Sequence, residues 1–128
     1  MKLTDTFAKV IKSAGIKNVF GLQGGAVVHF CDSLEKNKIN VTYTNHEVSA
    51  ALAATAYSKV TKNLGCAIVT TGPGSTNAIT GLMAAWQDSV PVIFISGQAR
   101  STHVSYGKKV RQVGTQEVNI CDIVKPLT

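Results

Sequence analysis

Two long apolar runs constrain the fold of this chain more than any other feature. Residues 66–71 (CAIVTT) and 90–96 (VPVIFIS) are largely apolar and rich in β-branched side chains. A strand of this kind needs cover on both of its faces, which is typical of parallel sheets packed between helices. The stretch between the two runs is long enough for the helical crossover that parallel strands require. The two runs therefore predict a βαβ unit at the centre of a layered domain.

The rest of the chain repeats this alternation of strand and helix patterns. The expected helices cover residues 4–14, 26–37, 47–62 and 75–87, and the remaining strands cover residues 18–22, 39–44 and 121–124. Thr4 or Asp5 is expected to cap the first helix, Gly15 to stop it, and Ser75 or Thr76 to cap the fourth. The pattern predicts a single α/β domain, residues 1–128, whose parallel sheet is flanked by helices on both faces.

The helix that begins at Glu47 carries small side chains along one face. Ala51, Ala54 and Ser58 share this face with Glu47, and Ala50 lies beside them. Such a face lets another backbone approach closely, with Glu47 at the rim of the contact. Loss of water at the rim would favour the neutral, hydrogen-bond-donating form of the carboxyl group. Alternatively, Glu47 only complements the helix dipole, as acids in a first helical turn commonly do.

Four loops rich in glycine or polar residues follow predicted strands. They contain Gln23-Gly24-Gly25, Asn45-His46-Glu47, Gly72-Pro73-Gly74 and Gly97-Gln98. Because the carboxyl ends of parallel strands meet at one edge of a sheet, we expect these loops to converge on one site. The Gly72-Pro73-Gly74 turn before a helix could hold a phosphate group, although it lacks the Lys-Ser/Thr ending of a P-loop.

In order and spacing, these motifs resemble the N-terminal, pyrimidine-binding (PYR) domain of thiamine diphosphate enzymes of the acetolactate synthase type. The resemblance is carried by FGLQGGA at residues 20–26, NHE at 45–47, TTGPGSTN at 70–77, DSVP at 88–91 and ISGQ at 95–98. It extends from Leu3 to Leu127. A lone Gly-Pro-Gly would be weak evidence, whereas four ordered motifs around a correctly placed glutamate are a specific signal.

The resemblance implies a thiamine diphosphate-binding fold and a catalytic role for Glu47. In the family, the equivalent glutamate donates a hydrogen bond to N1′ of the aminopyrimidine ring, which promotes loss of the C2 proton of the thiazolium. The cofactor then attacks the carbonyl of a 2-oxoacid such as pyruvate, and carbon dioxide leaves. The same resemblance implies that the cofactor-binding residues are Gly24, Gly25, Glu47, Gly72, Pro73 and Asn77.

Three further polar residues are substrate candidates by the same resemblance. Gln98 matches the Gly-Gln that ends a central strand in the family, and Gln116 matches the glutamine of its Phe-Gln-Glu stretch. His29 lies just inside the predicted helix after the first glycine loop and could face the site, although a helix histidine more often has a structural role.

The chain departs from the family pattern at two positions. Gln23 stands where the family usually has proline, and Thr115 replaces the aromatic residue of the Phe-Gln-Glu stretch. The second change weakens the likeness to acetolactate synthase itself, because the aromatic residue shapes its substrate pocket. The run at residues 111–117 (RQVGTQE) is closer to related enzymes of polysaccharide pathways.

The resemblance also implies a second half-site outside this sequence. The family holds the diphosphate through Mg²⁺ on another domain, marked by a Gly-Asp-Gly motif that does not occur here. The cofactor lies between this domain and the diphosphate-binding domain of a partner subunit. We therefore expect a homodimer or homotetramer formed through the Glu47 helix, no metal ligands in this chain and no activity from the chain alone. Whether FAD is also bound stays open.

The basic charge does not indicate a nucleic-acid partner. The chain has 13 Lys and Arg against 7 Asp and Glu, a formal charge of +6. Most of these lysines are scattered, and only residues 100–111 approach a basic cluster. A nucleic-acid surface would need a coherent basic stripe with stacking aromatic side chains. This segment could equally meet an anionic substrate.

The remaining composition favours a cytoplasmic protein. No apolar run is long enough to span a membrane, and the start of the sequence lacks the apolar run of a signal peptide. Cys31, Cys66 and Cys121 are far apart and without metal-type spacing, so they are expected to be reduced and mostly buried.

Two alternatives to the enzyme hypothesis remain at this point. A non-catalytic domain could use the same fold for oligomerisation or regulation, although such a module would need neither Glu47 nor the Gly-Pro-Gly loop. A nucleotide-binding, flavodoxin-like domain is the weaker alternative, because the sequence has no phosphate loop of that type.

Overall fold

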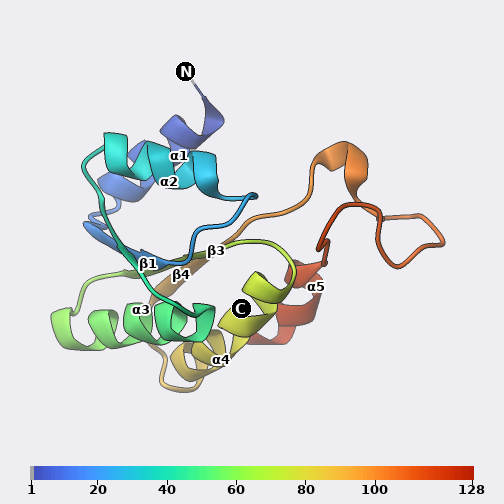
Figure 1. The fold of residues 1–128 in the computed structure, drawn as a ribbon. Coiled ribbons are helices and arrows are strands. Elements are labelled where there is room, and N and C mark those ends of the chain that lie inside the picture. The colour runs from blue at the N-terminus through green and yellow to red at the C-terminus, as the bar shows by residue number, and fades with distance from the viewer. Residues whose placement is uncertain (1) are drawn as a thin grey trace.

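A four-stranded parallel sheet forms the centre of the computed structural model, which describes residues 2–128 (Figure 1). The strands are β1 (Asn18–Gly21), β2 (Asn40–Tyr43), β3 (Gly65–Val69) and β4 (Val92–Ser96), in the order β2-β1-β3-β4. Each neighbouring pair is parallel. β3 pairs with β4 along its whole length, from Gly65 opposite Val92 to Val69 opposite Ser96. The two apolar runs therefore do form neighbouring strands.

Helices cover both faces of the sheet, so the predicted α/β class is confirmed. α1 (Leu3–Ser13) and α2 (Val28–Lys36) lie on one face, as Figure 1 shows. α3 (Glu47–Thr61), α4 (Pro73–Gln87) and the short α5 (Ile120–Val124) lie on the other. Two short 3-10 helices, η1 (Ser101–His103) and η2 (Lys125–Leu127), complete the described elements. Among residues 2–128, no helix is both long and apolar enough to cross a membrane.

The main core lies between the sheet and the α1–α2 layer. Its members are the buried residues Ala8, Ile11, Ile16, Val19, Val27, Phe30, Cys31, Leu34, Ile39, Cys66 and Ile68. Cys31 and Cys66 are buried as predicted, whereas Cys121 is exposed. Burial raises the pKa of the Cys66 thiol to about 12, so this side chain is an unreactive part of the core at neutral pH.

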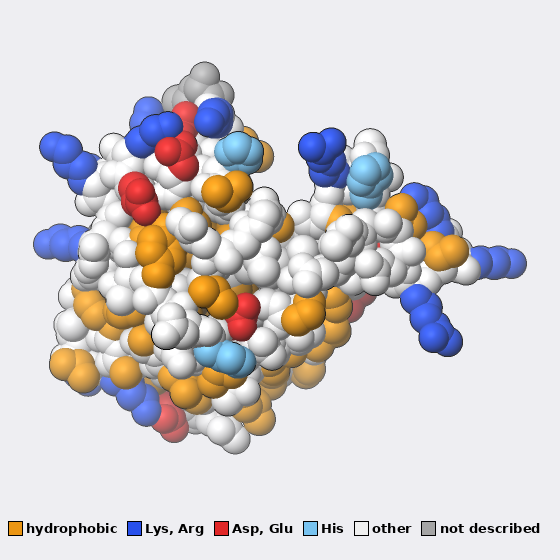
Figure 2. Space-filling model, viewed as in Figure 1, with side chains coloured by type: hydrophobic (Ala, Val, Ile, Leu, Met, Phe, Trp, Pro, Cys, Tyr) orange, Lys and Arg blue, Asp and Glu red, His pale blue; other side chains and the backbone are white. Residues whose placement is uncertain are grey.

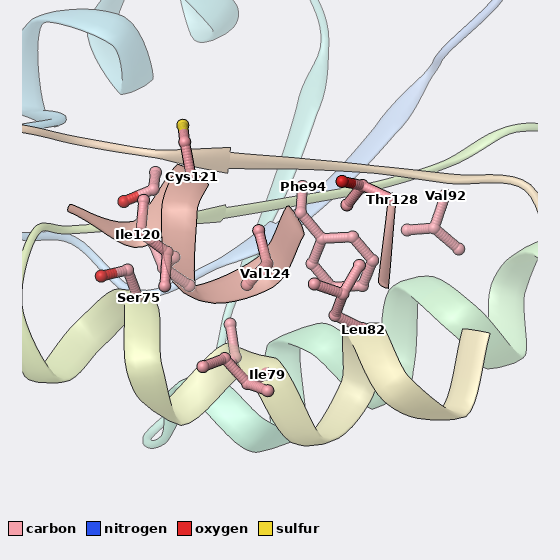
Figure 3. Close-up of a pocket in the computed structure, with 12 residues that line it drawn as sticks. Ser75, Ile79, Leu82, Val92, Phe94, Ile120, Cys121, Val124 and Thr128 are labelled. Atoms are coloured by element: carbon pink, nitrogen blue, oxygen red, sulfur yellow. The ribbon is translucent and has the colours of Figure 1, made fainter. Parts of the chain in front are cut away.

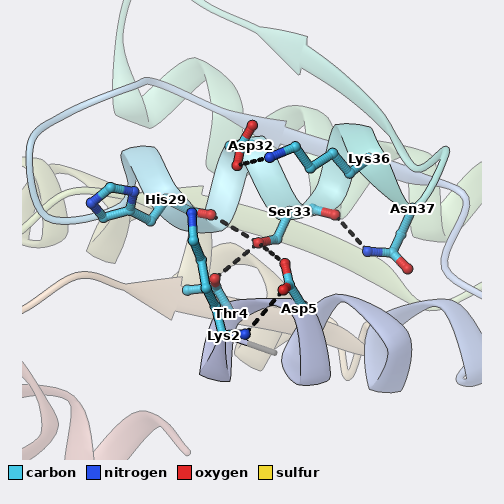
Figure 4. Close-up of polar contacts among 8 residues, drawn as sticks. All are labelled: Lys2, Thr4, Asp5, His29, Asp32, Ser33, Lys36 and Asn37. Atoms are coloured by element: carbon cyan, nitrogen blue, oxygen red, sulfur yellow. Dashed lines mark hydrogen bonds and ion pairs between the residues drawn. The ribbon is translucent and has the colours of Figure 1, made fainter.

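A buried hydroxyl joins α1 to α2. The predicted cap of α1 is wrong, because the helix begins at Leu3 and Asp5 lies inside its first turn. There Asp5 Oδ2 accepts the backbone N–H of Lys2 at 3.1 Å, while Asp5 Oδ1 accepts the hydroxyl of the fully buried Ser33 at 2.7 Å (Figure 4). These hydrogen bonds, that from Ser33 above all, hold the pKa of Asp5 below its ordinary value.

The small side chains of α3 pack within this chain. Ala51 and Ala54 are fully buried. α4 approaches so closely that a Cβ added to Gly81 would lie 2.7 Å from the carbonyl carbon of Ala51. Gly65 of β3 is similarly close to the carbonyl oxygen of Ala54. The backbones that the small face admits are therefore those of α4 and β3, and a second molecule can contact only the outward face of α3.

The predicted last strand at residues 121–124 is wrong, because this segment belongs to helix α5. Asn119 is the N-cap residue, and its Oδ1 accepts the backbone N–H of Asp122 at 3.4 Å. Ile120 and Val124, four residues apart, both turn towards α4 (Figure 3). A run of four mostly apolar residues fits either a strand or a helix, and here the cap and the packing against α4 favour the helix.

Candidate functional site

The loops at the carboxyl edge of the sheet form the candidate site. β1, β3 and β4 are adjacent and parallel, so the loops that follow Gly21, Val69 and Ser96 emerge at the same edge. A hydrogen bond from the Gly97 N–H to the Val69 carbonyl, at 2.9 Å, continues the pairing into the last of these loops. This edge is where ligands of open parallel sheets usually bind.

Glu47 is the first residue of α3 and lies at this edge with little exposure. Its side chain is 12% exposed, and its Oε2 accepts a hydrogen bond from Asn77 Nδ2 of α4 at 3.0 Å. Its Oε1 has no hydrogen-bond partner among the described residues and lies next to Gly74, where an added Cβ would be 3.4 Å away. The carboxyl group thus has one oxygen fixed by the chain and one available to a ligand.

His46 caps α3, a role that the sequence reasoning did not assign. Its Nδ1 accepts the backbone N–H of Val48 at 3.2 Å and lies 4.0 Å from Glu47 Oε2. The Thr44 hydroxyl donates to the His46 carbonyl at 2.8 Å and so fixes the turn before the helix. Capping patterns favour Ser, Thr, Asp and Asn, and a histidine cap therefore gives no clear sequence signal.

The turn between β3 and α4 requires glycine at position 72. Gly72 has a φ of +65°, and an added Cβ would collide with the carbonyl oxygen of Gln116. α4 begins at Pro73, so the predicted cap at Ser75 or Thr76 is wrong. The Ser75 hydroxyl instead donates to the Gly72 carbonyl at 2.8 Å. Proline suits the first helical position because it has no N–H to leave unpaired.

The glycine loop after β1 borders the same edge. Gly24 packs against β3, and an added Cβ would lie 2.5 Å from the Cβ of Thr70. Gly25 has no neighbour within 4 Å of such an atom and faces a hollow that Gln116 also lines. His29 is exposed in the first turn of α2, and no described contact joins its ring to the other candidate residues.

Gln98 and Gln116 reach the edge in different ways. The Gln98 side chain is used within the chain: its Oε1 accepts from the Thr71 hydroxyl at 3.1 Å and from the Ala99 N–H at 2.8 Å. Its Nε2 donates to the Val118 carbonyl at 2.6 Å. Gln116 accepts from the Thr71 hydroxyl through its backbone carbonyl, at 3.1 Å, and has a φ of +57°. Its side chain makes no described hydrogen bond.

Glu117 organises the loop that precedes it, which the sequence reasoning also missed. Its Oε1 accepts from the backbone N–H and the hydroxyl of Ser105, and its Oε2 accepts from the backbone N–H groups of Val113, at 2.9 Å, and Gly114, at 3.4 Å. Backbone hydrogen bonds to the charged form lower the pKa of Glu117 to about 2. The only sequence signal for this role is weak: an acid three residues after a glycine in a polar loop.

A separate apolar hollow of about 230 Å³ lies between α4, β4 and α5 (Figure 3). Ile79, Leu82 and Phe94 project into it, and Ile120 and Val124 close it from α5. The Ser75 hydroxyl at its end is already bonded to a backbone carbonyl. With no charged side chain in its walls, this hollow offers no ionic side chain to a ligand, and its lining does not include Glu47.

Comparison with known families decides what kind of domain carries this arrangement. The chain matches the family described as "Thiamine pyrophosphate enzyme, N-terminal TPP binding domain" over residues 1–123. The chain belongs to this family. The resemblance drawn from the motifs is thereby confirmed, together with the fold that it implied.

Relatives of this thiamine pyrophosphate enzyme domain include acetolactate synthase large subunits. The chain is 40% identical over 116 residues to that of Cyanidium caldarium, which covers 88% of this chain and 19% of the relative. It is 33% identical over 128 residues to a probable acetolactate synthase large subunit of Methanocaldococcus jannaschii, 100% of this chain and 21% of the relative. It is 39% identical over 94 residues to isozyme 2 of Escherichia coli, 73% of this chain and 17% of the relative.

The chain thus spans about a fifth of the length of these relatives. Within residues 2–128 of this thiamine pyrophosphate enzyme domain, no group of three or more His, Cys, Asp or Glu side chains is arranged to hold a metal ion.

Proposed function

We propose that this chain is the pyrimidine-binding half of a thiamine diphosphate-dependent 2-oxoacid decarboxylase or carboligase similar to acetolactate synthase. Membership of the thiamine pyrophosphate enzyme family and the names of the relatives support the cofactor and the reaction class. The observation that carries the assignment is the Glu47 carboxyl group, which is 12% exposed, held by Asn77 through one oxygen and unpartnered at the other.

The residues at the carboxyl edge fit an aminopyrimidine ring. Glu47 Oε1 is available to a ring nitrogen, and the low exposure of the side chain protects such a hydrogen bond from water. Gly72 and Pro73 present a turn without a long side chain, against which a flat ring can lie. Gly25 leaves open space beside the loop after β1, whereas Gly24 lets that loop pack against Thr70. We therefore infer that Glu47, Asn77 and these glycine loops hold the pyrimidine end of the cofactor.

Glu47 would act by holding a proton. Thiamine diphosphate, when bound, supplies the thiazolium carbon that adds to the 2-oxoacid and retains the electron pair left by carbon dioxide. Glu47 Oε1 would hold its proton against the ring nitrogen N1′, and Asn77 would keep the carboxyl group from rotating away because its amide donates to Oε2. The packed α3–α4 pair would keep Glu47 and Asn77 at a constant distance, because close-packed helices resist displacement.

We further propose that the diphosphate and Mg²⁺ are held by a domain outside this chain, contributed by a partner subunit. The relatives are about five times longer, which leaves room for such a domain. On this view the isolated chain binds only half of the cofactor and is inactive. Gln116 and Gln98 would then border the substrate, with Gln98 acting mainly as the support of the loop.

A second copy of the chain would contact the outward face of α3 and α4. Leu52 and Val60 of α3 and Met83 and Trp86 of α4 are exposed. Figure 2 shows apolar side chains along the lower edge of the molecule, over these two helices. An exposed apolar surface of this kind is typical of protein contacts, and its member Leu52 lies five residues after Glu47 on α3.

The test is the exchange of the C2 proton of bound thiamine diphosphate for deuterium in the complete enzyme. Glu47→Gln keeps the size of the side chain but cannot hold the proton in the same way, so we expect exchange to slow by about 10²- to 10⁴-fold. Glu35→Gln is the matched control, because Glu35 is an exposed glutamate on α2. Exchange at the normal rate in Glu47→Gln would contradict the role assigned to Glu47.

A further inference from the structure

A hollow of about 390 Å³ at the carboxyl edge has the guanidinium of Arg100, the ring of His103 and no anionic side chain in its walls. Its lining residues are Gly25, Ala26, Thr70, Thr71, Gln98, Ala99, Arg100, His103, Gly114, Thr115 and Gln116. They come from the loops after β1, β3 and β4 and from the segment before Glu117. Figure 2 shows a notch between the body of the molecule and a projecting arm, with histidine and basic side chains beside it.

Arg100 and His103 of the hollow are unused within the chain. Arg100 and His103 are exposed, and their side chains have no hydrogen-bond or ion-pair partner among residues 2–128. Glu117, which follows Gln116 of the hollow, has both oxygens occupied by hydrogen bonds from Ser105, Val113 and Gly114. The Arg100 guanidinium therefore has no ion-pair partner among residues 2–128. Lys108 and Lys109 lie on the same arm, which is the segment from Arg100 to Gly114, and they add further positive charge.

The walls that carry these groups are held in place by hydrogen bonds. Gln98 is fixed by the Thr71 hydroxyl and the Val118 carbonyl, directly before the η1 turn. In this turn the His103 N–H donates to the Arg100 carbonyl at 2.7 Å, which places both side chains on one short segment. Gly114 packs so closely against Ala99 that an added Cβ would lie 2.6 Å from the Ala99 Cβ. A binding site with fixed walls loses less conformational entropy when it takes a ligand.

We propose that this hollow binds the anionic group of the substrate, with the Arg100 guanidinium as the charged ligand and His103 as a second donor. The inference rests on the proposed function, because it places the substrate next to the Glu47 edge. A guanidinium presents paired N–H groups that match two oxygens of a carboxylate or a phosphate. The shared chemistry is an oxyanion, which can belong to a 2-oxoacid or to a phosphorylated acceptor.

The neighbouring loops place this oxyanion site close to the proposed cofactor position. Gly25 and Gln116 line the hollow, and the carbonyl of Gln116 lies against Gly72 in the turn that precedes α4. Thr71, directly before that turn, also lines the hollow. An anion bound by Arg100 would therefore have its remaining atoms directed along the edge towards Glu47. Arg100 is a substrate-binding residue on this view and takes no part in proton transfer.

The first test uses the complete enzyme with ¹³C-labelled histidine rings and two probes, pyruvate and inorganic phosphate, each added alone. We expect a probe to shift the His103 ring signals, assigned by their loss in His103→Gln. The shift should disappear in Arg100→Gln and persist in Lys109→Gln, which removes the same charge from the same arm outside the hollow. Tighter binding of pyruvate identifies a carboxylate site, and tighter binding of phosphate identifies a site for a phosphorylated ligand.

The second test separates binding from chemistry. Arg100→Gln should raise KM for the anionic substrate by about 10- to 100-fold, as expected for a lost charge-assisted hydrogen bond, with little change in kcat. Arg100→Lys keeps the charge without the paired donors, so its KM should lie between those of the unmodified enzyme and Arg100→Gln. C2 proton exchange of the bound cofactor should be unchanged in these variants.

The outcomes distinguish this inference from the proposed function. The oxyanion site would be overturned if neither probe shifted the His103 ring signals. It would also be overturned if Arg100→Gln changed neither the probe-induced shift nor the KM. Failure of C2 exchange in the unmodified enzyme would instead refute the cofactor assignment, and the probe titration would still show whether the hollow binds an anion.

Discussion

One carboxylate, that of Glu117, holds the loop beside the proposed oxyanion site. It accepts backbone N–H groups from both ends of the loop, at Ser105 and at Val113 and Gly114. The ionised form makes these bonds, so protonation has to break them, which is why the pKa of Glu117 falls to about 2. Glu117, which follows Gln116 in sequence, thereby closes the loop that begins two residues after His103.

We expect this loop to loosen only in acid. The pKa of Glu117 in the folded chain, about 2, is below the ordinary value of 4.5. The stabilisation that ionised Glu117 gives to the loop is therefore complete above pH 4.5 and is lost as the pH falls through 2. The loosening of the loop is measured by amide hydrogen exchange at Ser105 and Val113, corrected for the intrinsic effect of pH. Glu117→Gln should exchange quickly even at neutral pH, whereas Glu35→Gln should not. Equal protection in Glu117→Gln and the unmodified chain would show that other contacts hold the loop.

At the scale of elements, the pairing of α3 with α4 determines the Glu47 site. Glu47 and Asn77 lie on different helices, and their 3.0 Å hydrogen bond depends on how closely those helices pack. Gly81 makes the close approach possible, because α4 at this point touches the backbone of α3 at Ala51. The small side chains of both helices thus have an indirect role in positioning the carboxyl group.

Gly81→Ala should therefore destabilise the domain despite favouring a helix. Overpacking costs about 1–3 kcal/mol, whereas replacing a helical glycine by alanine gains at most about 1 kcal/mol. Urea unfolding midpoints measure the difference. Gly25→Ala is the matched control, because an added Cβ there meets nothing within 4 Å, and its effect should stay within about 0.5 kcal/mol. An unchanged midpoint in Gly81→Ala would mean that α3 and α4 can separate at little cost.

At the scale of the whole molecule, the two helical layers differ in what they leave exposed. The outward face of α3 and α4 carries Leu52, Val60, Met83 and Trp86, and α3 begins at Glu47. The α1–α2 layer also exposes apolar side chains, among them Val10. The first of these faces belongs to the two helices that carry Glu47 and Asn77, which is why we assign the contact with a second copy to it.

Leu52→Asp should weaken self-association of the complete enzyme. A charge in the middle of an apolar contact has to be buried without a partner, so we expect the dissociation constant to rise by at least about 10-fold. Sedimentation over a range of concentrations measures it. Val10→Asp introduces the same charge on α1 and should leave association unchanged. If Val10→Asp dissociates the protein and Leu52→Asp does not, the contact lies on the other layer.

The elements of this fold were predictable wherever the local pattern was strong. β3 and β4 overlap the two apolar runs, and α3 begins at Glu47 as predicted. The errors fall where local signals are ambiguous. The 121–124 segment is too short for its period to distinguish a strand from a helix, and Ser75 and Thr76 have the side chains of caps although Gly72 and Pro73 start the helix.

Sequence by itself determined the alternation of strands and helices, and with it the edge at which the glycine loops and Glu47 emerge. This follows because side-chain periodicity is local and parallel strands all end on the same side. Only the tertiary structure decided that Asn77 holds Glu47, that Gln98 supports a loop, and that Glu117 anchors it. It also brought Arg100 and His103 to one hollow. The contacts of Asn77 and Gln98 join residues far apart in the chain, so their partners depend on how helices and loops pack, which no local pattern records.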